Sequence, residues 1–194
     1  MNGFRLEGHK RWSIVNRSLF DRINKEMMMI SKKMEAAINS QINKEMYSAY
    51  LYLAMSADSA EKGLVGFSAW FKTQYHEELE HAEKFYDYLL HQGATAALEA
   101  IAKPKGVFKK AVDLFDATLK HEKTVTASIY ELVDLAASEK DHATSSFLKW
   151  FVDEQVEEEA SAQEILTKLE MIGDSPSGLL YLDGKLGKRG AEKC

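Results

Sequence analysis

Cysteine is almost absent from this sequence of 194 residues, in which Cys194 is the only one. A single cysteine excludes an intrachain disulfide framework and a zinc site built from cysteines, and it is typical of proteins in a reducing compartment. Long apolar runs are missing too, because no stretch approaches the ~18 consecutive apolar residues that a membrane helix needs. We therefore expect a cytoplasmic protein without a membrane-spanning segment.

Proline is also scarce: the chain has two, far below the average usage of roughly 5%. Alanine, leucine, methionine, glutamate and lysine, which favour helices, are plentiful. This composition predicts an all-α fold and argues against a sheet protein. The length suits one domain with a sizeable core.

Basic residues are in deficit, with 25 lysines and arginines against 30 acidic residues and a formal charge of −5. This balance argues against a general nucleic-acid or anionic-membrane binder and favours cationic partners. The charge is uneven, because residues 1–28 carry +3 and the remainder carries −8. We interpret 1–28 as an N-terminal extension of unknown role, 29–189 as the folded domain and 190–194 as a C-terminal tail.

Apolar residues recur at spacings of three and four from Met29 to Ile172, a pattern that predicts helices. Ser31 is a suitable N-cap for the first helix, and Gly63 and Gly66 bracket the turn after it. The predicted helices span residues 31–61, 64–92, 111–139 and 141–172, and a short fifth segment spans 176–187.

Eighteen residues, 93–110, join the second predicted helix to the third. Such a linker can extend to ~60 Å, whereas a helix of about 28 residues is ~42 Å long. The linker can therefore cross the full length of a bundle and let the second and third helices run parallel. This is the layout of a four-helix bundle with one long crossover.

A carboxylate interrupts the inward apolar stripe of each long helix: in chain order the four are Glu45, Glu78, Glu122 and Glu158. An ionised carboxylate buried alone costs several kcal/mol, so four of them near mid-helix require cations. If the inward face assigned to a helix is wrong by one residue, the glutamate of that helix can instead lie at a solvated edge. Four at matching depth make that reading much less probable.

A pair of metal ions satisfies these carboxylates. Glu78 and His81 stand three residues apart and share a helix face. Glutamates from the other helices complete a mixed oxygen and nitrogen ligand set, which suits iron or manganese. Tyr52, on the same stripe as Glu45, is either a core tyrosine or a hydrogen-bond donor to a ligand such as Glu122.

Four segments together resemble the ferroxidase-site motifs of bacterial non-haem ferritin. They are residues 42–48 (INKEMYS), 77–81 (EELEH), 120–123 (KHEK) and 150–159 (WFVDEQVEEE). The resemblance extends from about residue 29 to 189. It implies a ferritin-like four-helix bundle with one long crossover and a short C-terminal helix, assembled as a cage of 24 subunits that stores iron.

The resemblance also implies a di-iron site within each subunit. Glu45, Glu78 and His81 would bind the first iron, and Glu78, Glu122 and Glu158 the second, with Glu78 bridging the two. Fe(II) would be oxidised there to Fe(III) by dioxygen or peroxide and then deposited as mineral in the cavity.

Further residues match neighbouring positions of the family site. Gln155 would lie beside the iron pair and assist the oxygen chemistry, and Tyr52 matches a tyrosine that supplies an electron. Glu77, Glu154 and Glu157, together with Glu158, match a third iron position on the cavity side.

Two departures refine the resemblance. Bacterioferritin and rubrerythrin carry a second Glu-x-x-His motif, whereas Gln155 and Glu158 stand at the corresponding positions here, which favours ferritin proper. Ser145 and Leu148 replace the acidic pair that lines the three-fold channel of animal heavy-chain ferritins. Iron uptake through an acidic channel of that kind is therefore in doubt.

Two other function classes remain as alternatives. A small di-iron oxidase or peroxidase would act without storing iron, but the sequence lacks the cysteine-ligated iron centre of rubrerythrin-type peroxidases. A DNA-protecting mini-ferritin is suggested by the basic residues 1–28, but those proteins build their iron sites between subunits. We expect no nucleic-acid or membrane partner.

Overall fold

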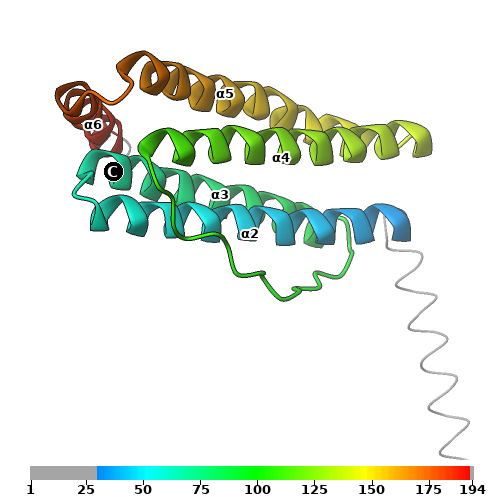
Figure 1. Ribbon diagram of the computed structural model, residues 1–194. Coiled ribbons are helices and arrows are strands. Elements are labelled where there is room, and N and C mark those ends of the chain that lie inside the picture. Colours follow the sequence, from blue (N-terminus) through cyan, green and yellow to red (C-terminus); the bar gives the residue numbers. More distant parts are fainter. Residues whose placement is uncertain (1–29, 193–194) are drawn as a thin grey trace, which may run out of the picture.

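The computed structural model describes residues 30–192, which contain helices and no strand. The helices are α2 (Lys32–Glu61), α3 (Val65–His91), α4 (Ala111–Glu139), α5 (His142–Ile172) and α6 (Pro176–Glu192) (Figure 1). The predicted all-α bundle with a short C-terminal helix is confirmed. The extension 1–28 and Cys194 lie outside the described residues.

Local signals in the sequence account for several helix ends. The Ser31 hydroxyl accepts a hydrogen bond from the Met34 amide at 2.9 Å, and the Asp141 carboxylate accepts one from the Thr144 amide at 3.0 Å, so both residues act as N-caps. Lys140 ends α4 in the left-handed region, with φ of 58°. Proline at the start of α6 is tolerated because its missing N–H would have no helical partner. α6 continues to Glu192, five residues past the predicted end at Gly187.

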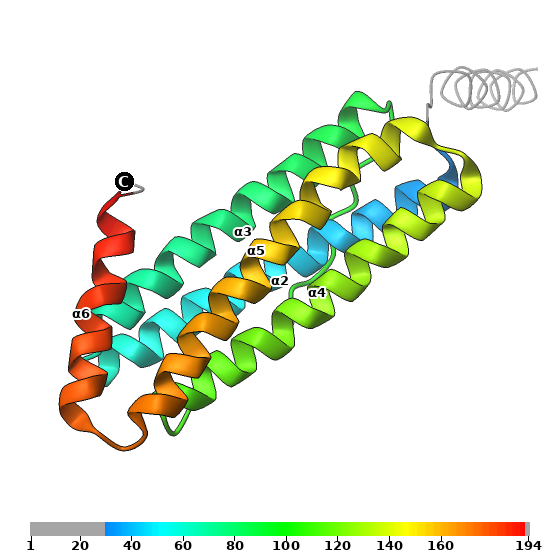
Figure 2. The ribbon, with the colours of Figure 1, turned by 90° about the horizontal axis from the view of Figure 1, so that it is seen from above.

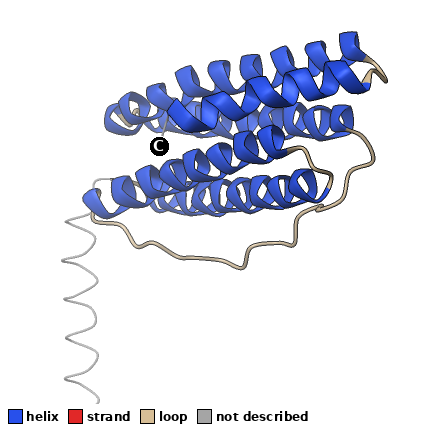
Figure 3. Ribbon diagram, turned by 90° about the vertical axis from the view of Figure 1, so that its left-hand side faces the viewer, coloured by secondary structure: helices blue, strands red, loops and turns tan. Residues whose placement is uncertain are grey.

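The four long helices form two antiparallel pairs, α2 with α3 and α4 with α5 (Figures 1 and 3). The segment between α3 and α4 runs back along α2, so α3 and α4 are parallel, as predicted. Side chains of α2 hold this crossover: Asn39 donates to the Thr95 carbonyl at 2.9 Å and accepts from the Ala97 amide at 2.6 Å. Lys62 donates to the Phe108 carbonyl farther along.

α6 lies across the end of the bundle where α3 begins (Figure 2). α3 has no side-chain cap of its own. Instead the buried Asp183 carboxylate of α6 accepts from the amides of Gly66 and Phe67 at 2.8 and 3.0 Å, which satisfies two free amides of the helix start. The helices approach so closely that a Cβ on Gly66 would lie 1.7 Å from the Asp183 carbonyl oxygen. Only glycine fits there without displacing α6.

Two apolar clusters form the core, and they occupy opposite ends of the bundle. The cluster near α6 includes Phe67, Trp70 and Phe115, and the other includes Phe85 and Phe151. On every long helix, buried polar residues separate the two clusters: Gln41, Glu45, Gln74, Glu78, His81, Glu122, Gln155 and Glu158. We call these eight residues the polar layer.

Within the described part of the chain, no helix combines the length and apolar character that crossing a membrane requires.

Candidate metal centre

Three residues of the polar layer form a close group of potential metal ligands. Glu45 of α2 and Glu78 and His81 of α3 each offer one ligand atom, and these atoms lie within 4.8 Å of one another. The three residues are 1%, 2% and 4% exposed. His81 and Glu78 stand one helical turn apart, with 3.5 Å between His81 Nδ1 and Glu78 Oε2. Two carboxylates and one imidazole match the ligand preference of iron.

Glu122 of α4 and Glu158 of α5 are buried in the same layer. The charge of Glu158 acts on both Glu78 and Glu122, and the charge of Glu45 acts on Glu122. All five predicted ligands therefore lie near one another at the centre of the bundle. Among the described residues, only Glu45, Glu78 and His81 form such a close group, so the ligand atoms of the second predicted position are not gathered as tightly.

Burial disfavours the ionised form of the carboxyl groups in the polar layer. It raises the pKa of the Glu45 carboxyl to about 8, and the neighbouring Glu78 carboxylate adds to this effect. The pKa values of Glu78 and Glu122 are also held well above their usual range, first by burial and then by the charge of Glu158. Near neutral pH the metal-free layer therefore retains protons, which a bound cation would displace.

Two carboxylate oxygens of the layer, Glu45 Oε2 and Glu78 Oε2, are buried and accept no hydrogen bond from an N–H or hydroxyl group of the described residues. Leaving such an atom unsatisfied costs about 1–3 kcal/mol or more. Both glutamates belong to the close group with His81. A divalent cation between the helices would satisfy both at once, so the residues present fit a metal.

Tyr52 and Gln155 both contact Glu122. The Tyr52 hydroxyl donates to Glu122 Oε1, the hydrogen bond anticipated from the sequence. Gln155 Nε2 lies 3.3 Å from Glu122 Oε2 and 3.2 Å from the Thr126 hydroxyl. Thr126 in turn donates to Glu159 at 2.5 Å. Glu122 is thus oriented from two sides.

His121, which lies in the predicted motif 120–123, is a further neighbour of the polar layer. Its ring lies edge-on to Tyr52, with 6.0 Å between ring centroids, and its Nε2 is 2.8 Å from the Ser48 hydroxyl. Burial lowers the pKa of the His121 imidazole to about 4, so the ring is neutral at physiological pH. It packs behind Tyr52 and helps to hold it.

The residues of the predicted third iron position are less buried. Glu77 and Glu154 are half-buried, and their charges contribute to the raised pKa of Glu78, so both lie beside the layer. Glu157 is exposed. Among the described residues, none of these three belongs to the close ligand group.

Leu148, one of the two positions matching the acidic channel pair, is fully buried in the apolar cluster away from α6. Its side chain does not reach the surface of the subunit. This burial explains why an acidic residue is unsuitable at position 148 in this bundle.

Sequence reasoning missed Gln41 and Ser128. Gln41 Nε2 donates to Glu45 Oε1 at 2.8 Å, and the Ser128 hydroxyl donates to Gln41 Oε1 at 2.9 Å. The only signal for Gln41 was its position one helical turn before Glu45, on the same helix face. Ser128 gave none, because its contact joins two helices.

A family comparison, the similar sequences and a similar solved structure agree with one another. Residues 35–172 match the ferritin-like domain. A bacterial non-heme ferritin of Bacteroides fragilis (strain YCH46) is 42% identical over 161 residues, which cover 83% of this chain and 100% of that protein. One of Staphylococcus aureus (strain MRSA252) is 39% identical and is covered to 97%. In a crystal structure of an open pore ferritin from the archaeon Archaeoglobus fulgidus, the matched chain is 47% identical with a TM-score of 0.81, covering 81% of this chain and 98% of that one.

Proposed function

The chain belongs to the ferritin-like family, and from this we propose that it stores iron by oxidising Fe(II) in the polar layer and depositing the Fe(III) as mineral. The observation that carries the proposal is the pair of buried, unsatisfied oxygens on Glu45 and Glu78, beside the His81 imidazole. Fe(II) supplies the positive charge that these oxygens lack, and it is here the substrate.

In the proposed reaction two Fe(II) ions bind in each subunit. Glu45, Glu78 and His81 hold the first, and Glu78, Glu122 and Glu158 hold the second. The ions give two electrons to dioxygen, which takes up two protons to form hydrogen peroxide; if peroxide is the oxidant, the products are two waters. Carboxylate oxygens are hard ligands that favour Fe(III), so the ligand set favours oxidation.

Other residues have supporting roles in the proposal. Tyr52 holds Glu122 through the hydrogen bond from its hydroxyl, and Gln155 lies beside the iron pair and also contacts Glu122. Glu77, Glu154 and Glu157 receive iron on its way to the mineral. Their lower burial supports this role, because a transfer site must exchange ions with its surroundings.

Storage requires a cavity, and we propose a cage of 24 copies with α6 near the four-fold axes. Large apolar side chains exposed on the crossover and on α6 support self-assembly, because contact with neighbouring copies would remove them from water. Leu98 and Val107 of the crossover are 74% and 75% exposed, and Leu180 and Tyr181 of α6 are 63% and 69% exposed.

Aerobic addition of Fe(II) to the purified metal-free protein tests this function. We expect ferric absorbance to rise quickly for the first two irons per chain and then to continue while the mass of a large particle grows. Retention of only two irons per chain on a small particle would favour a di-iron oxidase or peroxidase, and no ferric absorbance would refute the oxidation step. Binding of duplex DNA at low salt would support the mini-ferritin alternative.

A further inference from the structure

Two buried glutamines of the polar layer each donate a hydrogen bond to a different carboxylate. Gln41 Nε2 donates to Glu45 Oε1 at 2.8 Å, and Gln74 Nε2 donates to Glu158 Oε2 at 2.9 Å. Both glutamines are 1% exposed. Of the two positions in the proposed di-iron site, Glu45 belongs to the first and Glu158 to the second.

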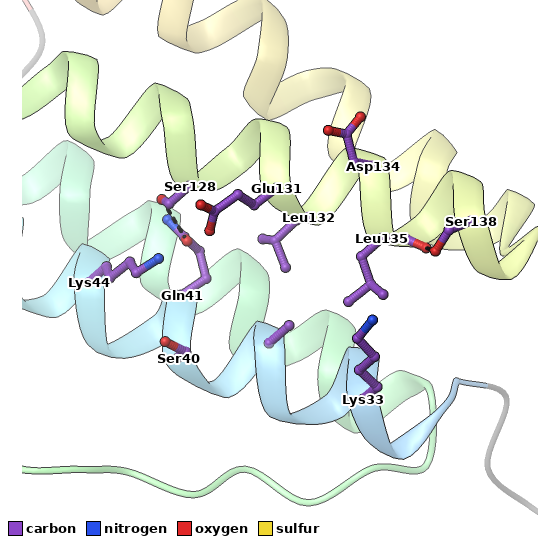
Figure 4. Close-up of a pocket in the computed structure, with 11 residues that line it drawn as sticks. Lys33, Ser40, Gln41, Lys44, Ser128, Glu131, Leu132, Asp134, Leu135 and Ser138 are labelled. Atoms are coloured by element: carbon purple, nitrogen blue, oxygen red, sulfur yellow. Dashed lines mark hydrogen bonds between the residues drawn. The ribbon is translucent and has the colours of Figure 1, made fainter.

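Gln41 is held at both ends of its amide. Its oxygen accepts from the Ser128 hydroxyl at 2.9 Å, while its nitrogen donates to Glu45. The two residues line a cavity of about 450 Å³ between α2 and α4, where the Gln41 amide points toward Ser128 (Figure 4). Because one carboxylate oxygen of Glu45 is engaged by Gln41, the other is left for a metal.

Gln74 is held at one end only. Its nitrogen donates to Glu158, but its buried oxygen Oε1 has no hydrogen-bond partner in the described part of the chain. Within residues 30–192, no serine donates to Gln74 as Ser128 donates to Gln41. The Gln74 amide is therefore held by one hydrogen bond, whereas the Gln41 amide is held by two.

Hydrogen bonds from residues behind the ligands orient those ligands and change metal affinity by 10–100-fold. We propose that Gln41, with Ser128, and Gln74 are positioning residues, each for a different metal position: Gln41 orients Glu45 for the first and Gln74 orients Glu158 for the second. The proposal rests on the function above only in taking two metal positions per chain.

Anaerobic titration with Co(II) follows metal binding at the two positions through the absorbance bands of the bound ion. Co(II) binds carboxylate and imidazole ligands and is not oxidised when oxygen is excluded. The test variants are Gln41→Met and Gln74→Met, since methionine keeps the length of glutamine and removes the amide. Gln92→Met is the matched control, because Gln92 is a buried glutamine just after the end of α3, outside the layer. Glu45→Ala and Glu158→Ala identify which binding step belongs to which position.

We expect the parent to bind two Co(II) per chain in two steps. Gln41→Met should weaken about tenfold the step that Glu45→Ala removes, and Gln74→Met the step that Glu158→Ala removes. Gln92→Met should change neither. Ser128→Ala should weaken the same step as Gln41→Met, and adding it to Gln41→Met should cause little further loss, because both act through one chain of hydrogen bonds.

Equal losses in both steps from either glutamine variant, or no loss, would overturn the positioning roles. A variant that fails to fold is recognised by its far-UV circular dichroism, and Ser128→Ala, a small change, then tests the first position alone. If the parent binds two Co(II) per chain but the variants do not weaken the expected steps, the positioning roles are wrong and the proposed function is unaffected. If the parent binds none, the proposed function fails.

Discussion

Replacing Glu78 with alanine is expected to slow the initial oxidation of Fe(II) by at least about 100-fold. The reason is that Glu78 is the proposed bridge, so its loss removes a ligand from both metal positions, and residues that merely support ligands already cost 10–100-fold. Glu78 is 2% exposed and shares the close ligand group with Glu45 and His81. Stopped-flow measurement of the ferric absorbance at two Fe(II) per chain gives the rate.

Glu80→Ala is the matched control for this prediction. Glu80 lies two residues along α3 from Glu78 and is exposed, so its removal should leave the rate unchanged. Sedimentation and far-UV circular dichroism establish that both variants assemble and fold as the parent does. A Glu78→Ala variant that oxidises iron as fast as the parent would contradict the assignment of the site.

The metal-free protein is expected to lose stability as the pH rises from about 5 to 8. The folded pKa of Glu45 is about 8 against an ordinary value of 4.5, so between these values the native chain holds a proton that the unfolded chain has released. The native state then binds more protons, and the free energy of unfolding falls as pH rises. Glu78 and Glu122, whose pKa values are also raised, act in the same direction.

Saturating Co(II) is expected to restore the lost stability at pH 8. A ligand at 100–1,000 times its dissociation constant contributes about 2.7–4.1 kcal/mol to the native state, or roughly 5–15 °C in melting temperature for a chain of this size. Calorimetric melting curves at pH 5 and pH 8, with and without metal, measure both effects.

The Glu45→Gln variant supplies the control for the pH effect. Glutamine keeps the shape of glutamate without its titration, so the metal-free variant should show a smaller fall in melting temperature between pH 5 and 8. Two results would contradict the view that buried carboxyl groups of the polar layer stay protonated without metal. One is a metal-free parent with equal melting temperatures at pH 5 and pH 8. The other is a parent that Co(II) does not stabilise at pH 8.

Much of the fold was predictable because local signals and chain length agree. The near absence of proline, the N-cap residue Ser31 and the spacing of apolar residues define the helices. The 18 residues between the second and third helices are long enough to cross the bundle, which fixes the parallel arrangement of α3 and α4. The carboxylates were predictable because each interrupts an otherwise apolar stripe.

The parts that sequence reasoning missed depend on contacts between distant segments. The cap that Asp183 provides for α3 joins residues 117 positions apart and produces no local pattern. Ser128 reaches Gln41 across 87 positions. The sequence also did not show that Glu45, Glu78 and His81 form a closer group than Glu78, Glu122 and Glu158. Spacing along a helix places a carboxylate on a face without giving its distance from carboxylates on other helices.

Diffraction from crystals soaked anaerobically in Fe(II), recorded at the iron absorption edge, tests the central claim most directly. The account predicts two anomalous peaks in the polar layer of each chain. One should lie within coordination distance of Glu45, Glu78 and His81, and the other within coordination distance of Glu78, Glu122 and Glu158. Iron found only at surface carboxylates, with no peak between the two apolar clusters, would contradict it.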